Sequence, residues 1–327
     1  MAGNAVPALT AADFAPGGEL RALHHLQKNH IPSVYGATPY WRPKAPGIWR
    51  QVEEPEWNWS HPGREESAEV SGNVLLDCNG AFLAPLSGTE LAHGALLRTG
   101  PIPTPGPRQV LPGYYLIGNL GWADPRIFSP LGQATMPAQI WVAAPTLQLL
   151  LELAEGGHVR DITIYDSWTC DQKCRLTGWA AWLREVRLLA MDTDEERRRL
   201  YPVGWKPECA DAVKRGYSIA IQLMAHEPKK GENGEKGEER KSGVFRPDWT
   251  HAIRAQHKAN IWRKAWNCLQ KDIPVLYMGN TDEVELPAWA VVHLIDMDRK
   301  IAPIKIDLTG RQLGSFKIKS KEEVEDA

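Results

Sequence analysis

The stretch Leu75-Leu76-Asp77-Cys78-Asn79-Gly80-Ala81-Phe82-Leu83 places one acidic residue at the end of an apolar run, directly before a tight turn. The pattern predicts a buried strand over Val74–Phe82, and the Asn-Gly pair predicts a turn because both residue types tolerate left-handed backbone angles. A strand that delivers a carboxylate is one way in which metal-dependent phosphoryl-transfer enzymes begin an active site. Alone, such an acid is more simply explained as an ordinary turn residue, so the interpretation depends on a second acid.

A second strand with an acidic turn follows later in the chain. Residues 273–286 consist of an apolar run, the tetrapeptide Asn280-Thr281-Asp282-Glu283 and another apolar run. This pattern predicts a hairpin over Ile273–Val292 with Asp282 in its turn, although such a turn is also a common hairpin connection. The order of the two acids, with a lysine-bearing helix between them, favours their acting as a pair.

Length and composition indicate a globular protein. With 327 residues, 43% of them apolar, the chain can bury a substantial core in one large or two small domains. The formal charge of -2 gives no overall attraction to nucleic acid, but a locally basic groove is compatible with a neutral total. Five cysteines without regular spacing are typical of a reducing compartment, and no segment approaches the roughly 20 apolar residues of a membrane span. We therefore expect a cytoplasmic protein without membrane contact.

Composition and periodicity divide the chain into six segments. Residues 1–73 are an irregular wrapping segment, 74–145 carry the first acid and short strands, and 146–227 form a largely helical insert. The composition of residues 228–243 predicts a disordered loop, because this segment has almost no apolar side chains. Residues 244–319 carry the second acid and a basic hairpin, and 320–327 form an acidic tail.

Helical spacing and alternation predict individual elements within these segments. Helices are expected where apolar residues recur at helical spacing, and Asp248 is expected to cap the last of them. The predicted helices are Thr146–Glu155, Leu176–Leu200, Pro207–Ala225 and Asp248–Lys271, and the predicted strands include Val159–Trp168 and two short ones around Ile304 and Phe316.

The order of these elements resembles the palm and fingers of family B DNA polymerases, the group that includes protein-primed phage replicases. The first motif of that family is Asp-x-x-Ser-Leu-Tyr, often with Asn at its third position. Asp77, Asn79 and Phe82 match it, whereas Gly80 and Ala81 stand where the family has Ser and Leu.

The two other motifs match less closely. The family's third motif, Asp-Thr-Asp-Ser in a hairpin turn, is similar to Asn280-Thr281-Asp282-Glu283, which retains only the second acid. Its second motif, Lys-x-x-x-Asn-Ser-x-Tyr-Gly on a fingers helix, is similar to the segment Lys214–Ser218 in its lysine alone. The resemblance covers residues 74–319 and rests on three short motifs.

The resemblance implies an α+β fold, with an antiparallel polymerase-like palm sheet and a helical fingers-like insert. It implies that Asp77 and Asp282 are the catalytic carboxylates and hold two Mg²⁺ ions, with Mn²⁺ as an alternative. It further implies that nucleotide-binding residues come from the first motif and the lysine helix, with the aromatic ring under the sugar. These residues are Phe82, Asn79, Lys214 and Arg215.

The same resemblance implies template-directed addition of deoxynucleotides to a DNA primer-template. The basic segment Leu313–Lys319 and the helix before the third motif are expected to hold DNA, through Lys317, Lys319, Arg254 and Lys258. With about seventy residues before the first acid, we expect no proofreading exonuclease domain. Such a reduced enzyme suits a phage, plasmid or other mobile element and a protein primer or replication partner.

Two other function classes remain open. Degenerate second and third motifs favour a non-catalytic, DNA-binding replication-accessory protein that has kept a polymerase palm as scaffold. A ribonuclease-H-like nuclease would also end its first strand with Asp77, but it predicts more acids on neighbouring strands and has no need of Lys214.

Three further patterns are assigned structural explanations. The literal Asp192-Thr193-Asp194 follows a helical run without flanking strands, so we interpret it as a solvated helix end. Cys170 and Cys174 resemble half of a zinc site but lack a second pair at metal spacing. The arginines at 184, 187 and 197–199 could contact phosphate, although charge runs are usually solvated helix faces.

Overall fold

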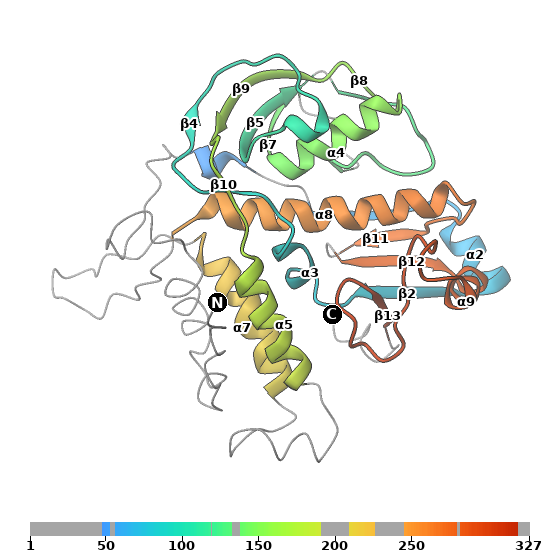
Figure 1. The fold of residues 1–327 in the computed structure, drawn as a ribbon. Coiled ribbons are helices and arrows are strands. Elements are labelled where there is room, and N and C mark those ends of the chain that lie inside the picture. The colour runs from blue at the N-terminus through green and yellow to red at the C-terminus, as the bar shows by residue number, and fades with distance from the viewer. Residues whose placement is uncertain are drawn as a thin grey trace, which may run out of the picture.

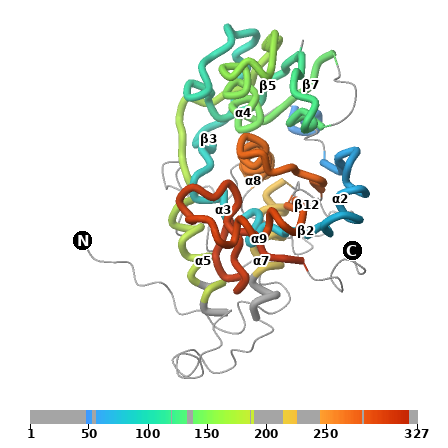
Figure 2. Tube along the Cα trace, turned by 90° about the vertical axis from the view of Figure 1, so that its right-hand side faces the viewer, coloured from blue at the N-terminus to red at the C-terminus, as the bar shows by residue number. Residues whose placement is uncertain are grey.

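The computed structural model describes residues 48–52, 56–118, 120–132, 138–190, 209–225, 245–279 and 282–319. They form two antiparallel sheets on opposite sides of one long helix, α8 (Pro247–Leu269), and a helix pair that projects from one end (Figure 1). Turned by 90°, α8 again lies between the elements of the two sheets (Figure 2). None of the described helices is both long and apolar enough to cross a membrane. Residues 1–47 of the predicted wrapping segment, the predicted loop 228–243 and the predicted tail 320–327 lie outside these ranges.

The five-stranded sheet carries the first predicted acid and the strand that follows the second. Its order is β1 (Asn58–Ser60), β11 (Tyr277–Gly279), β12 (Glu283–Pro287), β2 (Asn73–Cys78) and β13 (Phe316–Ile318). Every neighbouring pair is antiparallel. An antiparallel sheet combined with separate helices confirms the predicted α+β class.

The two faces of this sheet have opposite chemistry. Leu76, Val284 and Leu286 are fully buried and belong to the main apolar cluster. Side chains alternate along a strand, so Glu283 and Glu285 of β12 lie on the other face. Glu285 accepts two hydrogen bonds from Arg64, at 2.8 and 2.7 Å, which pairs its buried carboxylate. One face therefore builds the core and the other is free for polar chemistry.

The second sheet lies across α8 from the first. Its order is β4 (Leu97–Arg98), β9 (Thr163–Thr169), β5 (Gly113–Gly118) and β7 (Gln139–Ala143), all antiparallel. Helix α4 (Ala144–Glu155) begins with Pro145 in its first turn, is rich in Leu and ends at Gly156. Because β9 pairs with β5, the segment expected to be a helical insert contributes a central strand to this sheet. Two small ribbons accompany it, β3 (Leu91–Ala92) with β10 (Lys173–Cys174) and β6 (Gly121–Trp122) with β8 (Val159–Arg160).

Helices complete the architecture. α5 (Thr177–Ala190) and α7 (Cys209–Leu223) pack on each other and on α3 (Leu83–Leu86), forming an apolar cluster with the first half of α8. The remaining elements are α2 (Arg64–Ser71), α9 (Ala288–Asp296) and the 3-10 turns η3 (Ile48–Gln51) and η4 (Pro107–Gln109). The part of the helix predicted beyond residue 190 lies outside the described residues.

Three sequence predictions are corrected. Residues 288–292, expected as the end of the second hairpin strand, belong to α9 (Ala288–Asp296), because Ala290, Val291 and Leu294 are buried at helical spacing. The strand expected around Ile304 is reduced to an isolated bridge between Ile306 and Phe316. Asp248 does not cap α8; it lies in the first turn of the helix.

Arg246 explains the position of Asp248. Arg246 is the N-cap residue of α8 and makes no side-chain cap of its own. Its Nε donates to Asp248 Oδ1 at 2.9 Å, and both side chains are buried. The carboxylate is therefore used to neutralise a buried guanidinium.

Helix α8 provides a test of where the stability resides. Trp262 is 0% exposed and stacks on Trp266 with ring centroids 5.4 Å apart. We predict that Trp262→Ala lowers the free energy of unfolding by about 3–5 kcal/mol through cavity formation, measured by urea denaturation. Trp289 on α9 is 49% exposed and serves as the matched control. If Trp289→Ala costs as much as Trp262→Ala, α8 is not the centre of the core.

Candidate active site

The pairing of β2 with β12 brings the two predicted acids together. Asp77 is the register partner of Glu283, the residue after Asp282, and Cys78 N donates to Asp282 O at 2.9 Å. Asp77 and Asp282 both line a cavity of about 290 Å³ at the end of the five-stranded sheet. The strands that the sequence predicted separately therefore deliver both carboxylates to one place.

Burial raises the pKa of both carboxyl groups. Burial, together with the negative charges of Asp77 and Glu283, raises the pKa of Asp282 to about 7. Burial also raises the pKa of Asp77, while Lys317 and Lys214 oppose that shift. Two desolvated carboxylates that repel each other favour a cation between them.

Lysines from two elements surround the acids. Lys214 of α7 lines the cavity, which is where its helix was expected to present it. Lys317 Nζ of β13 lies 3.7 Å from Asp77 Oδ2, and Lys319 Nζ lies 2.8 Å from Glu283 Oε1. The two residues predicted to hold DNA are thus already paired with carboxylates on the polar face of the sheet.

The turn after β2 is held by a buried arginine. Asn79 is 4% exposed; its Nδ2 donates to the carbonyl oxygen of Gly310 and its Oδ1 accepts from Arg187. Arg187 also donates to the hydroxyl of Tyr217 at 3.1 Å. The Asn79 amide, predicted to bind nucleotide, is therefore used to lock the turn to α5 and to the loop before β13.

Gly80 allows this close approach. Its φ of +69° lies in the left-handed region, and an added Cβ would meet the side chains of Leu313 and Arg187. Phe82 follows, lines the cavity and packs against His257 of α8, with ring centroids 5.7 Å apart. Phe82 therefore lines the same cavity as the two acids, and its predicted contact with a sugar stays a prediction.

Two of the predicted DNA contacts lie elsewhere. Lys258 lies on α8 and is 6% exposed. Arg254 is exposed on the same helix, and neither residue lines the cavity. Arg215 is exposed beside Lys214 but does not line the cavity either. Asn280, Thr281 and the segment Asp192–Asp194 lie outside the described residues.

Sequence reasoning gave no firm role to three cavity residues. Tyr217 and Ser218 follow Lys214 at three and four positions along α7, the spacing that places residues on one helix face. That spacing could have identified them. Arg187 was one of several arginines on a predicted helix, and only the fold shows that it is buried against the turn after β2.

The donor set suits magnesium better than a structural metal. In the described part of the chain, no cluster of three or more His, Cys, Asp and Glu side chains could hold a metal ion, and Cys170 and Cys174 are free thiols. Magnesium is usually held by one or two carboxylates together with waters and substrate phosphates. Asp77 and Asp282 provide two carboxylates at one cavity.

Comparison with solved structures shows the fold. Phi29 DNA polymerase in a ternary complex with primer-template DNA and incoming nucleotide matches with a TM-score of 0.56 and 12% identity, over 91% of this chain and 51% of that one. The same polymerase with single-stranded DNA matches with a TM-score of 0.58 and 12% identity, over 91% and 50%. The chain therefore has a polymerase-like fold and spans about half the length of that polymerase. No family model and no curated protein matches the sequence.

The raised pKa of Asp282 predicts how stability varies with pH. The folded protein holds a proton on this group up to about pH 7, whereas the unfolded chain releases it near its usual 3.8, so stability falls as pH rises between these values. We predict that Asp282→Asn reduces this fall by on the order of 1–3 kcal/mol between pH 5 and pH 8. Urea unfolding in the presence of a chelator measures it. Asp166→Asn on β9 is the control, and an unchanged slope in Asp282→Asn would contradict the burial of this carboxyl group.

Gly80 and Gly157 form a matched pair for testing the turn. Both have positive φ, but an added Cβ at Gly157 has nothing within 4 Å. We predict that Gly157→Ala costs about 1 kcal/mol from backbone strain alone, and that Gly80→Ala costs about 1–3 kcal/mol more because its neighbours must shift. Thermal and urea unfolding of the two variants provide the comparison. Equal losses would show that Arg187 and Leu313 do not confine the turn.

Proposed function

We propose that this protein is a metal-dependent, template-directed nucleotidyltransferase that adds deoxynucleotides to a DNA primer. The observation that carries the proposal is the convergence on one cavity of Asp77 in β2 and Asp282, the residue before the adjacent antiparallel strand β12, with Lys214 lining the same cavity. The likeness in fold to a polymerase supports it. In the proposal the cofactor is Mg²⁺, or Mn²⁺ in its place. The enzyme would replicate a phage or other mobile element, with a protein primer or a replication partner, and would act in the cytoplasm.

The cavity offers a role for each side chain. Asp77 and Asp282 would hold the divalent ions, which supply activation of the primer hydroxyl and neutralisation of the triphosphate. Lys214 faces the same cavity from α7 and provides a positive charge for a phosphate group. Phe82, backed by His257, presents a flat apolar surface to the sugar. Arg187 and Asn79 position the turn and are not free to bind substrate.

One observation favours a second candidate function. Lys317 places an ammonium 3.7 Å from Asp77, so a cation already stands near the position that a metal ion would take. This arrangement suits a DNA-binding accessory protein that uses the palm only as a scaffold. A nuclease predicts further acids beside Asp77; Glu283 and Glu285 are on the neighbouring strand, but each is paired with a basic side chain.

Primer extension tests the proposal directly. Labelled deoxynucleotides, a primer-template and Mg²⁺ are supplied to the wild type and to Asp77→Asn and Asp282→Asn. We predict that each substitution lowers incorporation by at least about a hundredfold, because several kcal/mol of charge stabilisation in the transition state depend on the metal ions. The corresponding metal affinity is measured by Mn²⁺ titration.

Asp166→Asn is the matched control, since it removes a carboxylate from the other sheet. It should leave incorporation unchanged. The enzymatic proposal is rejected if the wild type binds DNA but incorporates no nucleotide on any primer, and if both active-site variants bind DNA as well as the wild type does. That result would support the accessory protein.

A further inference from the structure

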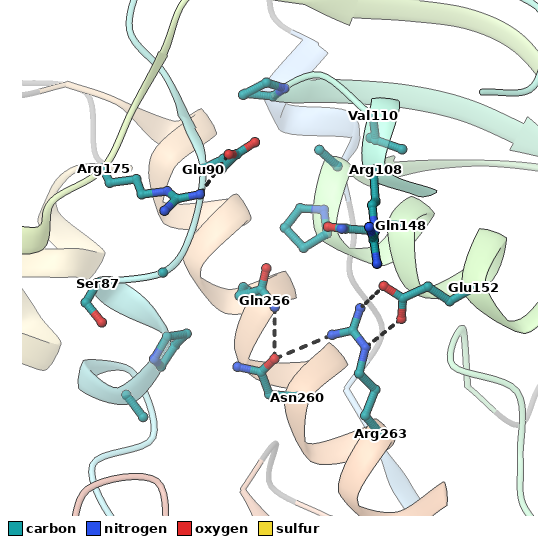
Figure 3. Close-up of a pocket in the computed structure, with 16 residues that line it drawn as sticks. Ser87, Glu90, Arg108, Val110, Gln148, Glu152, Arg175, Gln256, Asn260 and Arg263 are labelled. Atoms are coloured by element: carbon teal, nitrogen blue, oxygen red, sulfur yellow. Dashed lines mark hydrogen bonds and ion pairs between the residues drawn. The ribbon is translucent and has the colours of Figure 1, made fainter. Parts of the chain in front are cut away.

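A larger cavity, of about 560 Å³, lies between the second sheet and α8 (Figure 3). Its walls come from η4, α4, α8 and the end of α3, so it is separate from the cavity that holds the acids. The two cavities nevertheless share supports. Residues 80–82 line the smaller cavity, and Ala84 and Pro85, which follow them in the chain, line the larger one. On α8, His257 packs against Phe82 of the smaller cavity, and its neighbour in sequence, Gln256, lines the larger one.

The wall formed by α8 presents an ordered pair of amides. Gln256 Nε2 donates to Asn260 Oδ1 at 2.9 Å, and Arg263 Nη1 approaches the same oxygen at 3.5 Å. A guanidinium can only donate, so it fixes the oxygen of Asn260 towards Arg263. The Nδ2 of Asn260 remains as a donor and the Oε1 of Gln256 as an acceptor, and neither atom has a partner in the described part of the chain.

The carboxylates in this cavity are already neutralised. Glu152 accepts from Arg263 at 2.8 and 3.1 Å, and Glu90 accepts from Arg175 at 2.9 Å. Each of these two carboxylates is therefore paired with an arginine. A ligand that carries negative charge is therefore not repelled by either acid.

The opposite wall provides an uncompensated positive charge. Arg108 of η4 and Gln148 of α4 both line the cavity, and in Figure 3 their side chains lie together across from Gln256 and Asn260. Among the described residues, neither side chain has a hydrogen-bond or ion-pair partner. A guanidinium that faces a polar cavity without a carboxylate is suited to bind a phosphate.

We propose that this second cavity binds a nucleotide, with its base against Gln256 and Asn260 and its phosphate on Arg108. An adjacent amide donor and acceptor match the edge of a nucleobase, which presents a donor beside an acceptor. The volume lies within the range of small-molecule sites. The ligand is either a free nucleotide or an unpaired nucleotide of a single strand. The proposal does not depend on catalysis by Asp77 and Asp282.

The test is fluorescence anisotropy with two probes, a labelled short single-stranded oligonucleotide and a labelled nucleoside monophosphate. Asn260→Asp keeps the oxygen that accepts from Gln256 but replaces the free Nδ2 donor with a second oxygen. Arg108→Gln removes the charge alone. We expect each substitution to weaken binding of the responding probe by about tenfold.

The controls match each substitution in chemistry. Asn267→Asp changes an exposed residue on the same helix, and Arg160→Gln changes an exposed arginine on β8; both should bind as the wild type does. Response of the oligonucleotide alone identifies a strand, and equal response of the monophosphate identifies a free nucleotide. Absence of binding by both probes, or wild-type affinity in both Asn260→Asp and Arg108→Gln, overturns the proposal. Primer extension by the same variants tests the proposed enzyme independently, so a failure of this binding proposal can be distinguished from a failure of the enzymatic one.

Discussion

The burial of α8 on nearly all sides is the constraint on which the rest of the structure depends. Fifteen of its 23 residues are buried, and they contribute to all three apolar clusters of the described chain. A helix that is enclosed in this way must meet packing surfaces in several directions. The two sheets provide two of these surfaces, and the α5 and α7 pair provides the third. Both cavities are then lined or backed by α8, so their geometry follows from its position.

The polar chemistry depends on one strand register. Because Asp77 pairs with Glu283, Leu76 and Val284 are paired as well and face the core. A shift by one residue would turn Asp77 into the apolar cluster and expose Leu76, at a cost that the buried face makes prohibitive. The register that builds the core is therefore the same register that places the carboxylates at the cavity. No separate interaction is needed to bring Asp282 next to Asp77.

The sequence predicts those parts of the site that local patterns encode. An apolar run ending in Asp77, and another leading to Asp282, are visible because strands bury alternate residues and turns select Asn and Gly. Most of β9 lies in the predicted strand Val159–Trp168, but the second sheet is not predicted, since β5 and β9 are far apart in the chain and their pairing is decided by tertiary contacts. α9 was read as a strand because a short apolar run has no clear period. The amides of the second cavity gave no signal, because Gln256 and Asn260 acquire meaning only when η4 and α4 face them.

The contact between Lys317 and Asp77 bears on how the site would work. An ammonium at 3.7 Å satisfies one carboxylate, but it leaves Asp282 with its pKa raised to about 7 by burial and by the negative charge of Asp77. A divalent ion between the two carboxylates would act on both at once and carry twice the charge, whereas Lys317 is on an edge strand and one-third exposed. In the proposed function Asp77 and Asp282 would hold the divalent ions, and Lys317 would compete with them for Asp77. An ammonium beside the two carboxylates would also supply positive charge for a phosphate group.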